Sequence, residues 1–182
     1  GGPLSEPNSL VIDGSSNIYI TDAANNRVLK YVPATGSLTV LAGSGSGLTG
    51  FNTNTTPVSG TDALFYNPQG MVAARGGLVV ADSFNNAIRY VGFDGTVTNI
   101  AGSTNTSPYF VDDTNGLAAR FLFPVALAVD SGGNIYVADF GNKAIRKIAN
   151  DATNKVTTVV TLTDQPTAVA VGDGDDLWVA DR

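Results

Sequence analysis

PVALAVDSGGNIYVADFGNKAIRKI, residues 124–148, is the stretch that decides the fold, because the chain repeats it. Related segments begin at Pro7 (PNSLVIDGSSNIYITDAANNRVLKY), Pro68 (PQGMVAARGGLVVADSFNNAIRYV) and Pro166 (PTAVAVGDGDDLWVADR). Each copy places an aspartate 14 or 15 residues after its proline: Asp22, Asp82, Asp139 and Asp181. Self-similarity at this scale indicates an array of one supersecondary unit.

Within each copy apolar residues alternate with polar ones, which is the period of half-buried strands. In the third copy the alternation predicts four strands, at residues 126–129, 135–138, 145–148 and 156–160. Turn-forming residues such as DSGGN separate the first two strands, and no stretch shows sustained helical spacing. Four-stranded units repeated about an axis are the blades of a β-propeller. We therefore predict an all-β propeller of four-stranded antiparallel blades, with the short, proline-led strand innermost.

The copies also resemble a known family. Proline, an alternating strand, a Gly-Asn turn, IYVAD, NNRV or NKAI and a closing LAG are together similar to NHL repeats. The resemblance covers nearly the whole chain and implies a propeller, usually of six blades, so the propeller is incomplete within this chain. Such an arc is either part of a longer ring or an open unit completed by neighbouring copies.

We expect residues 1–182 to form a single β-propeller portion. The predicted blades are residues 7–43, 68–102 and 124–162, with a partial blade at 166–182. Two inserts, residues 44–66 and 103–123, separate the first three blades and end in similar sequences, GTDALFYNP and GLAARFLFP.

Composition narrows the possible environments and partners. Charged residues make up 14 % of the chain, well below the usual quarter, which favours an extracellular or cell-surface protein. The net charge of −6 argues against binding nucleic acid, and no apolar run is long enough for membrane insertion. The few basic residues gather near Arg27 and Arg146, where we expect a solvated face.

The repeated aspartates are predicted to be structural. Asp22, Asp82, Asp139 and Asp181 each end the second strand of a unit, and three of them precede Asn25, Asn85 and Asn142. A carboxylate followed by turn residues caps backbone N–H groups in an Asx-type turn. The acidic groups Asp112-Asp113 and Asp173-Asp176 are interpreted as solvated turns rather than Ca²⁺ sites.

The sequence predicts no catalytic residue, no metal ligand and no cofactor. Enzymes that resemble this family, such as streptogramin lyases, use histidine for metal binding or proton transfer, whereas this chain has no His and no Cys. A lactonase-like calcium site remains an alternative, although Glu6 is the only glutamate. The chain could therefore belong to a propeller enzyme, a lyase or lactonase, whose active site lies outside this segment.

The inserts are the predicted binding surface. They contain three apolar anchors, Phe51, Tyr109 and Phe110, and two candidate N-glycosylation sites, Asn54 and Asn105. We expect a non-catalytic extracellular recognition or assembly module whose insert-bearing rim binds a protein, a glycan or other copies of the chain. The alternative is that these aromatic side chains fold back onto the blades.

Overall fold

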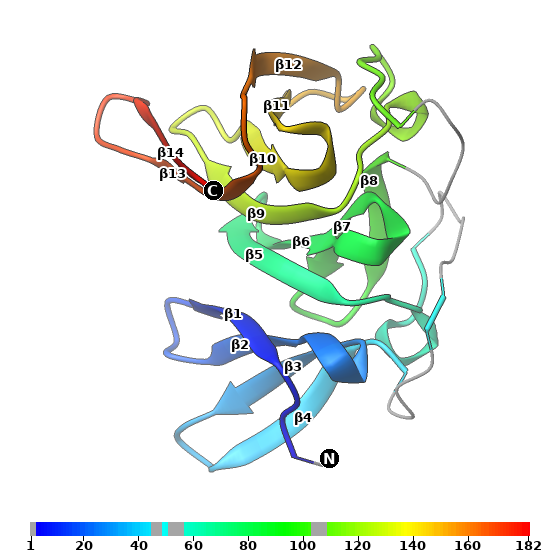
Figure 1. Cartoon of the computed structure of the whole chain (residues 1–182). Coiled ribbons are helices and arrows are strands. Elements are labelled where there is room, and N and C mark those ends of the chain that lie inside the picture. The colour runs from blue at the N-terminus through cyan, green and yellow to red at the C-terminus, as the bar shows by residue number, and fades with distance from the viewer. Residues whose placement is uncertain (1–2, 45–48, 51–56, 103–108) are drawn as a thin grey trace.

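The computed structural model describes residues 3–44, 49–50, 57–102 and 109–182, and it shows four antiparallel sheets in sequence order (Figure 1). The first contains β1 (Pro7–Ile12), β2 (Ile18–Asp22), β3 (Arg27–Val32) and β4 (Ser37–Ala42). The second contains β5 (Pro68–Ala74), β6 (Gly77–Asp82), β7 (Ala87–Gly92) and β8 (Val97–Gly102). The third contains β9 (Pro124–Val129), β10 (Ile135–Asp139), β11 (Ala144–Ile148) and β12 (Val156–Thr161). The fourth contains β13 (Pro166–Val171) and β14 (Leu177–Asp181).

The first strands of successive sheets lie side by side. β1 contacts β5, β5 contacts β9, and β9 contacts β13, while the other strands follow outward in chain order (Figure 1). The all-β, four-stranded antiparallel architecture is confirmed, as is the inner position of the proline-led strands.

Each inner strand begins at its proline, two or three residues earlier than the hydrophobic alternation predicts. The pairing register shifts between Pro7 and Leu10, between Pro68 and Met71, and between Pro166 and Ala168. A β-bulge interrupts the alternation of side chains, so the residues beside each proline do not show the strand period in the sequence. Proline itself is tolerated at the first residue of a strand.

The core lies between neighbouring sheets, and the second sheet is buried on both faces. Along β6, Leu78 and Val80 pack toward the first sheet, with Tyr19 and Val28. Val79 and Ala81, which alternate with them, pack toward the third sheet. This division follows directly from the two-residue period of a strand.

Five 3-10 turns complete the described structure. Three directly follow the repeated aspartates: η1 (Ala23–Asn25), η3 (Ser83–Asn85) and η5 (Phe140–Asn142). The other two, η2 (Gly60–Asp62) and η4 (Gly116–Ala118), lie in the inserts. None of the helical turns in the described ranges has the length and hydropathy needed to cross a bilayer.

The inserts fold back along the outer edge of the sheet that follows them. In the first insert Val58 exchanges two backbone hydrogen bonds of 2.9 Å with Val97 of β8. In the second, Asp113 and Val156 of β12 exchange bonds of 3.2 and 2.9 Å. Each insert therefore covers part of an edge that would otherwise present unpaired backbone groups.

Candidate functional site

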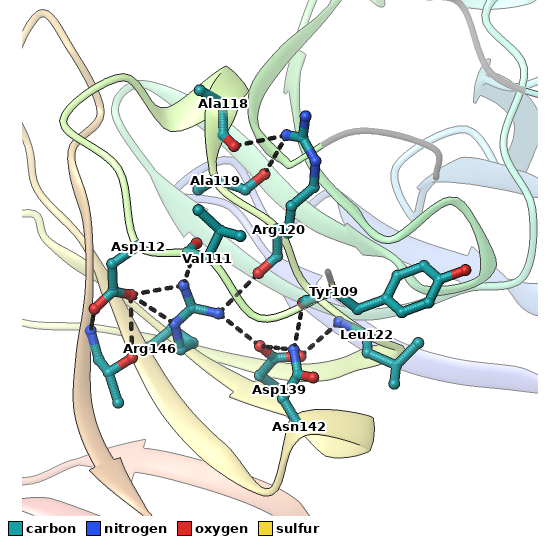
Figure 2. A network of polar contacts seen from close by, with 11 residues as sticks. Tyr109, Val111, Asp112, Ala118, Ala119, Arg120, Leu122, Asp139, Asn142 and Arg146 are labelled. Atoms are coloured by element: carbon teal, nitrogen blue, oxygen red, sulfur yellow. Dashed lines mark hydrogen bonds and ion pairs between the residues drawn. The ribbon is translucent and has the colours of Figure 1, made fainter. Parts of the chain in front are cut away.

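The buried carboxylate of Asp139 organises the densest polar network of the third blade (Figure 2). Its Oδ2 accepts hydrogen bonds from Arg146 Nη1 at 2.9 Å and from Asn142 Nδ2 at 2.8 Å. Its Oδ1 accepts the backbone N–H of Leu122, at the end of the second insert, at 2.8 Å. The end of β10, the turn η5 and the incoming insert are thus held by one side chain.

Arg146, which is also fully buried, binds further residues of the second insert. Its guanidinium donates to the carbonyl of Val111 at 2.7 Å, to the carbonyl of Arg120 at 2.9 Å and to Asp112 Oδ1 at 2.7 Å (Figure 2). Its Cζ lies 4.9 Å from the ring centroid of Phe110 and 5.1 Å from that of Phe121. Asp112 in turn accepts the backbone N–H of Thr158 on β12 at 2.8 Å.

The first two blades repeat the arrangement. In each, the aspartate pairs with an arginine, accepts from the asparagine three residues on, and accepts one backbone N–H of the chain entering the blade. The groups are Asp82 with Arg89, Asn85 and Tyr66, and Asp22 with Arg27, Asn25 and Ser5. Arg27 stands directly opposite Asp22 in the β2–β3 pairing, whereas Arg89 lies two residues further along its strand than the partner of Asp82.

Three sequence predictions need correction here. Asp22, Asp82 and Asp139 do not cap the backbone N–H groups of the turns that follow them; they accept a backbone N–H from the chain that precedes the blade instead. Arg27 and Arg146 were predicted on a solvated face, but they are 4 % and 0 % exposed because they pair with buried carboxylates. Asp112 was predicted in a solvated turn, and it forms an ion pair with Arg146. Asp181, at the end of β14, is exposed.

Burial dominates the electrostatics of these carboxylates. Desolvation raises the pKa of Asp82 to about 6, against the opposing effects of Arg89, Asn85 and the Tyr66 N–H. The same burial raises the pKa of Asp139 to about 6, opposed by Asn142, the Leu122 N–H and Arg146. Both carboxylates use their oxygens on protein donors and neither is exposed, so their chemistry supports the scaffold rather than a bound substrate.

Of the three candidate rim residues, the structure describes Tyr109 and Phe110 but not Phe51. Tyr109 is 40 % exposed; its carbonyl accepts from Asn142 Nδ2 at 2.8 Å while its ring points away from the network (Figure 2). Phe110 is 44 % exposed, although its ring packs on the Arg146 guanidinium. Phe51 and the candidate glycosylation sites Asn54 and Asn105 lie outside the described residues.

A second group of aromatic residues, which no sequence pattern indicates, lies at η3 and just before the inner strands β5 and β9. The ring centroid of Phe84, in η3, lies 4.9 Å from that of Tyr66 and 5.6 Å from that of Phe123. These side chains are 45 %, 42 % and 41 % exposed, respectively. Their repeat positions differ: Phe123 lies one residue and Tyr66 two residues before an inner strand, and Phe84 lies two residues after a repeated aspartate. No sequence period therefore reveals the group.

Residues 121–148 match the family model of the NHL repeat. No curated protein matches the chain. Among solved structures, virginiamycin B lyase from Staphylococcus aureus superposes with a TM-score of 0.69 at 16 % identity, over 99 % of this chain and 50 % of that one. A gluconolactonase from Xanthomonas campestris gives 0.67 at 16 % identity, over 96 % and 54 %.

An auxiliary nutrient binding protein from Bacteroides thetaiotaomicron gives a TM-score of 0.59 at 24 % identity, over 82 % of this chain and 36 % of that one. At these identities the likeness shows the fold alone, which is that of β-propeller proteins. The chain spans about half the length of the first solved structures that it matches.

Proposed function

Since residues 121–148 are an NHL repeat in a chain folded as part of a β-propeller, we propose that it is a non-catalytic recognition module whose insert-bearing rim binds an extracellular partner. The observation on which this rests is the way the second insert is held. Arg146 and Asp139 bind its backbone at Val111, Arg120 and Leu122. The described part of the insert, residues 109–123, is held before any partner arrives, which lowers the entropy cost of binding.

The fixed loop presents aromatic surface. Tyr109 directs its ring away from the buried network and has no side-chain hydrogen bond within the described part of the chain (Figure 2). An exposed, backbone-anchored tyrosine offers a large contact area with a polar hydroxyl at the end, a combination enriched at binding hot spots. A protein, a glycan or a second copy of the chain fits this chemistry.

Replacing Tyr109 with alanine in the complete protein tests the proposal. Because the contacts of Tyr109 with the network use its backbone carbonyl, the variant keeps them and should fold with an unchanged melting temperature. We expect loss of binding on a glycan array, or a change in oligomeric state measured by sedimentation velocity. The matched control is Phe93→Ala, an equally exposed ring on the β7–β8 hairpin that packs on Tyr19. If Tyr109→Ala preserves every bound glycan, protein partner and assembly state, the proposal fails.

Extracellular location is part of the same proposal and is supported by the low content of charged residues. Protease added to intact source cells should digest an exposed protein while a cytosolic marker survives. Survival of this chain until the cells are lysed would contradict the location.

A second candidate is a part of a propeller enzyme whose catalytic residues lie outside residues 1–182. It is favoured by the likeness in fold to a lyase and a gluconolactonase, each about twice as long as the matched segment. Turnover of a gluconolactone or of virginiamycin B by the complete protein, unaffected by Tyr109→Ala, would select this candidate over recognition.

A further inference from the structure

A hollow opens where the inner strands begin, on the side that carries η3 and η5. It has a volume of about 280 Å³ and is lined by Gln69 of β5, Val125 of β9 and the turn residues that follow the repeated aspartates. A smaller hollow of about 160 Å³ shares Gln69, Val125, Phe140 and Arg182, and extends to Thr167 of β13. The residues come from three successive blades, so the site exists only in the folded array.

One side of the hollow is aromatic. Phe84 and Phe123, which pack edge to face at 5.6 Å between ring centroids, line it together with Phe140. The side chains of Phe84 and Phe123 are each more than 40 % exposed, although apolar side chains of this size are usually buried. Ser83, 1 % exposed and also in the lining, has a buried Oγ without a hydrogen-bond partner in the described structure. The aromatic side therefore suits a ligand with a flat apolar ring, and the Ser83 hydroxyl in the lining has no hydrogen-bond partner among the described residues.

Arg182 supplies the charge. Its Cζ lies 5.5 Å from the ring centroid of Phe140, and its guanidinium makes no hydrogen bond or ion pair with any described residue. In contrast, Arg27, Arg89 and Arg146 are each paired with a buried aspartate. The lining contains no Asp or Glu. A guanidinium presents its N–H donors in a planar fork that matches the geometry of a carboxylate.

At this end of the blades, the positions that recur in every copy differ from the positions that line the hollow. The proline and the aspartate recur in all four copies, whereas the residue after the aspartate is Ala23, Ser83, Phe140 or Arg182. The residue after the proline is likewise Asn8, Gln69, Val125 or Thr167. Packing constrains the recurring positions; the varied positions line the hollow in the second, third and fourth copies.

We propose that this hollow binds a small carboxylate with a flat apolar ring. The ring lies against Phe84, Phe123 and Phe140, and the carboxylate is held by the Arg182 guanidinium. Gln69 donates its Nε2 to Asn67 Oδ1 at 2.7 Å, which leaves its Oε1 to accept a hydrogen bond from the ligand. The site includes Phe123, the last residue of the second insert, but neither Tyr109 nor Phe110, so it goes beyond the proposed recognition by Tyr109 and does not depend on it.

Phenylacetate is the probe, with 2-phenylethylamine, benzyl alcohol and phenyl phosphate as matched ligands of different charge. Saturation-transfer NMR and calorimetry on the complete protein should show that phenylacetate binds and that the amine does not. Arg182→Gln should weaken binding about tenfold or more, because a charge-assisted hydrogen-bonded pair is lost. Phe123→Ala should weaken it as well, whereas Phe93→Ala and Tyr109→Ala should leave it unchanged.

Melting temperatures establish that each variant is folded before its affinity is compared. The carboxylate site is overturned if phenylacetate does not bind, if Arg182→Gln binds it unchanged, or if the amine binds equally well. Tighter binding of phenyl phosphate than of phenylacetate, lost in Arg182→Gln, would also overturn it and make phosphate the recognised group. Since Tyr109→Ala tests the insert rim separately, failure of either proposal is distinguishable from failure of the other.

Discussion

Asp139 illustrates why the repeat retains an aspartate at this position. A buried carboxylate is tolerated only when it is paired and hydrogen-bonded, and this one has an arginine, an asparagine amide and a backbone N–H as donors. Removing one member of such a group takes a hydrogen-bond partner from each of the others while they stay buried, which can cost more than the group contributes by being present.

Asp139→Ala should therefore destabilise the protein by about 3 kcal/mol, the low end for a broken buried pair, because Arg146 then keeps only the partly exposed Asp112 as its ion-pair partner. A turn cap alone would be worth about 1 kcal/mol, so the magnitude separates the two roles. The measurement is urea unfolding, with Asp173→Ala, an exposed turn aspartate, as the control. A cost for Asp139→Ala no greater than that of a lost cap would contradict the buried-pair role.

Asp82 should make stability depend on pH in an unusual direction. Its pKa is about 6 in the folded protein and about 4 in the unfolded chain, so the folded state binds the proton more tightly. The resulting stabilisation is fully present below pH 4 and is lost as the pH rises through 6. Relative to Asp82→Asn, the wild type should lose about 2–3 kcal/mol of unfolding free energy between pH 4 and pH 7. A difference that stays constant over this range would show that Asp82 does not titrate there.

The repeated aspartates are predictable from the sequence as scaffold residues, but their partners are not. Arg89 and Arg146 occupy equivalent positions in two copies, while Arg27 stands two residues earlier, so no arginine recurs at one position in all three. Asp112 and the bound carbonyls belong to an insert, where the repeat offers no guide. Side-chain pairing across such a distance is set by the folded register, which a local pattern does not contain.

At the scale of elements, each insert packs closely against the two blades that it connects. Gly116 begins η4 where the second and third blades meet, and a Cβ there would lie 2.5 Å from the carbonyl of Ile100 and 2.6 Å from that of Asn154. Gly60 occupies the equivalent place in the first insert, between the backbone of Leu41 and that of Gly95. Only glycine lets the insert approach both blades so closely.

Gly116→Ala should displace the second insert from the edge of β12. Limited proteolysis should then cleave the segment 109–120 faster than in the wild type, and the melting temperature should fall, because the added methyl group meets backbone on two sides. Gly14→Ala is the control, since a Cβ at that hairpin position meets nothing within 4 Å. Equal cleavage rates for the wild type and Gly116→Ala would show that the insert is not held by this contact.

Strands and hairpins were predictable because their signals are local: a two-residue period and turn residues between apolar runs. The first residues of the inner strands could not be predicted, since the bulge after each proline interrupts the alternation of apolar and polar residues. The backbone pairing of Val58 with Val97 was equally hidden, because an isolated bridge of this kind has no period of its own.

For the molecule as a whole, adjacent blades are joined by asparagine side chains as well as by the core. Asn26, in the left-handed conformation at φ 54°, accepts the backbone N–H of Asn67 at 2.8 Å, just before the second blade. Asn86 does the same for Phe123, before the third blade, at 2.9 Å. At the equivalent position Lys143 donates to the carbonyl of Thr163 instead, at 2.8 Å.

Asn26→Gly should weaken the junction between the first two blades by about 1 kcal/mol, because glycine keeps the left-handed backbone but removes the acceptor. The denaturant midpoint should fall, and the slope of the transition should decrease if the blades separate before they unfold. Ser16→Gly is the matched control, since Ser16 has φ 63° at an exposed hairpin tip. Identical transitions for the two variants would exclude this asparagine from the junction.

The fastening of each insert by the blade that follows it has a consequence for how the protein is made and rearranged. During translation residues 109–120 leave the ribosome before Asp139 and Arg146. These residues therefore cannot form their contacts with the two side chains until the next blade has been synthesised. The same dependence sets the piece of gene that duplication or grafting can move without loss. That piece is an insert together with its downstream blade, residues 103–162 for example, and cutting at the edges of the visible sheets would leave the loop behind.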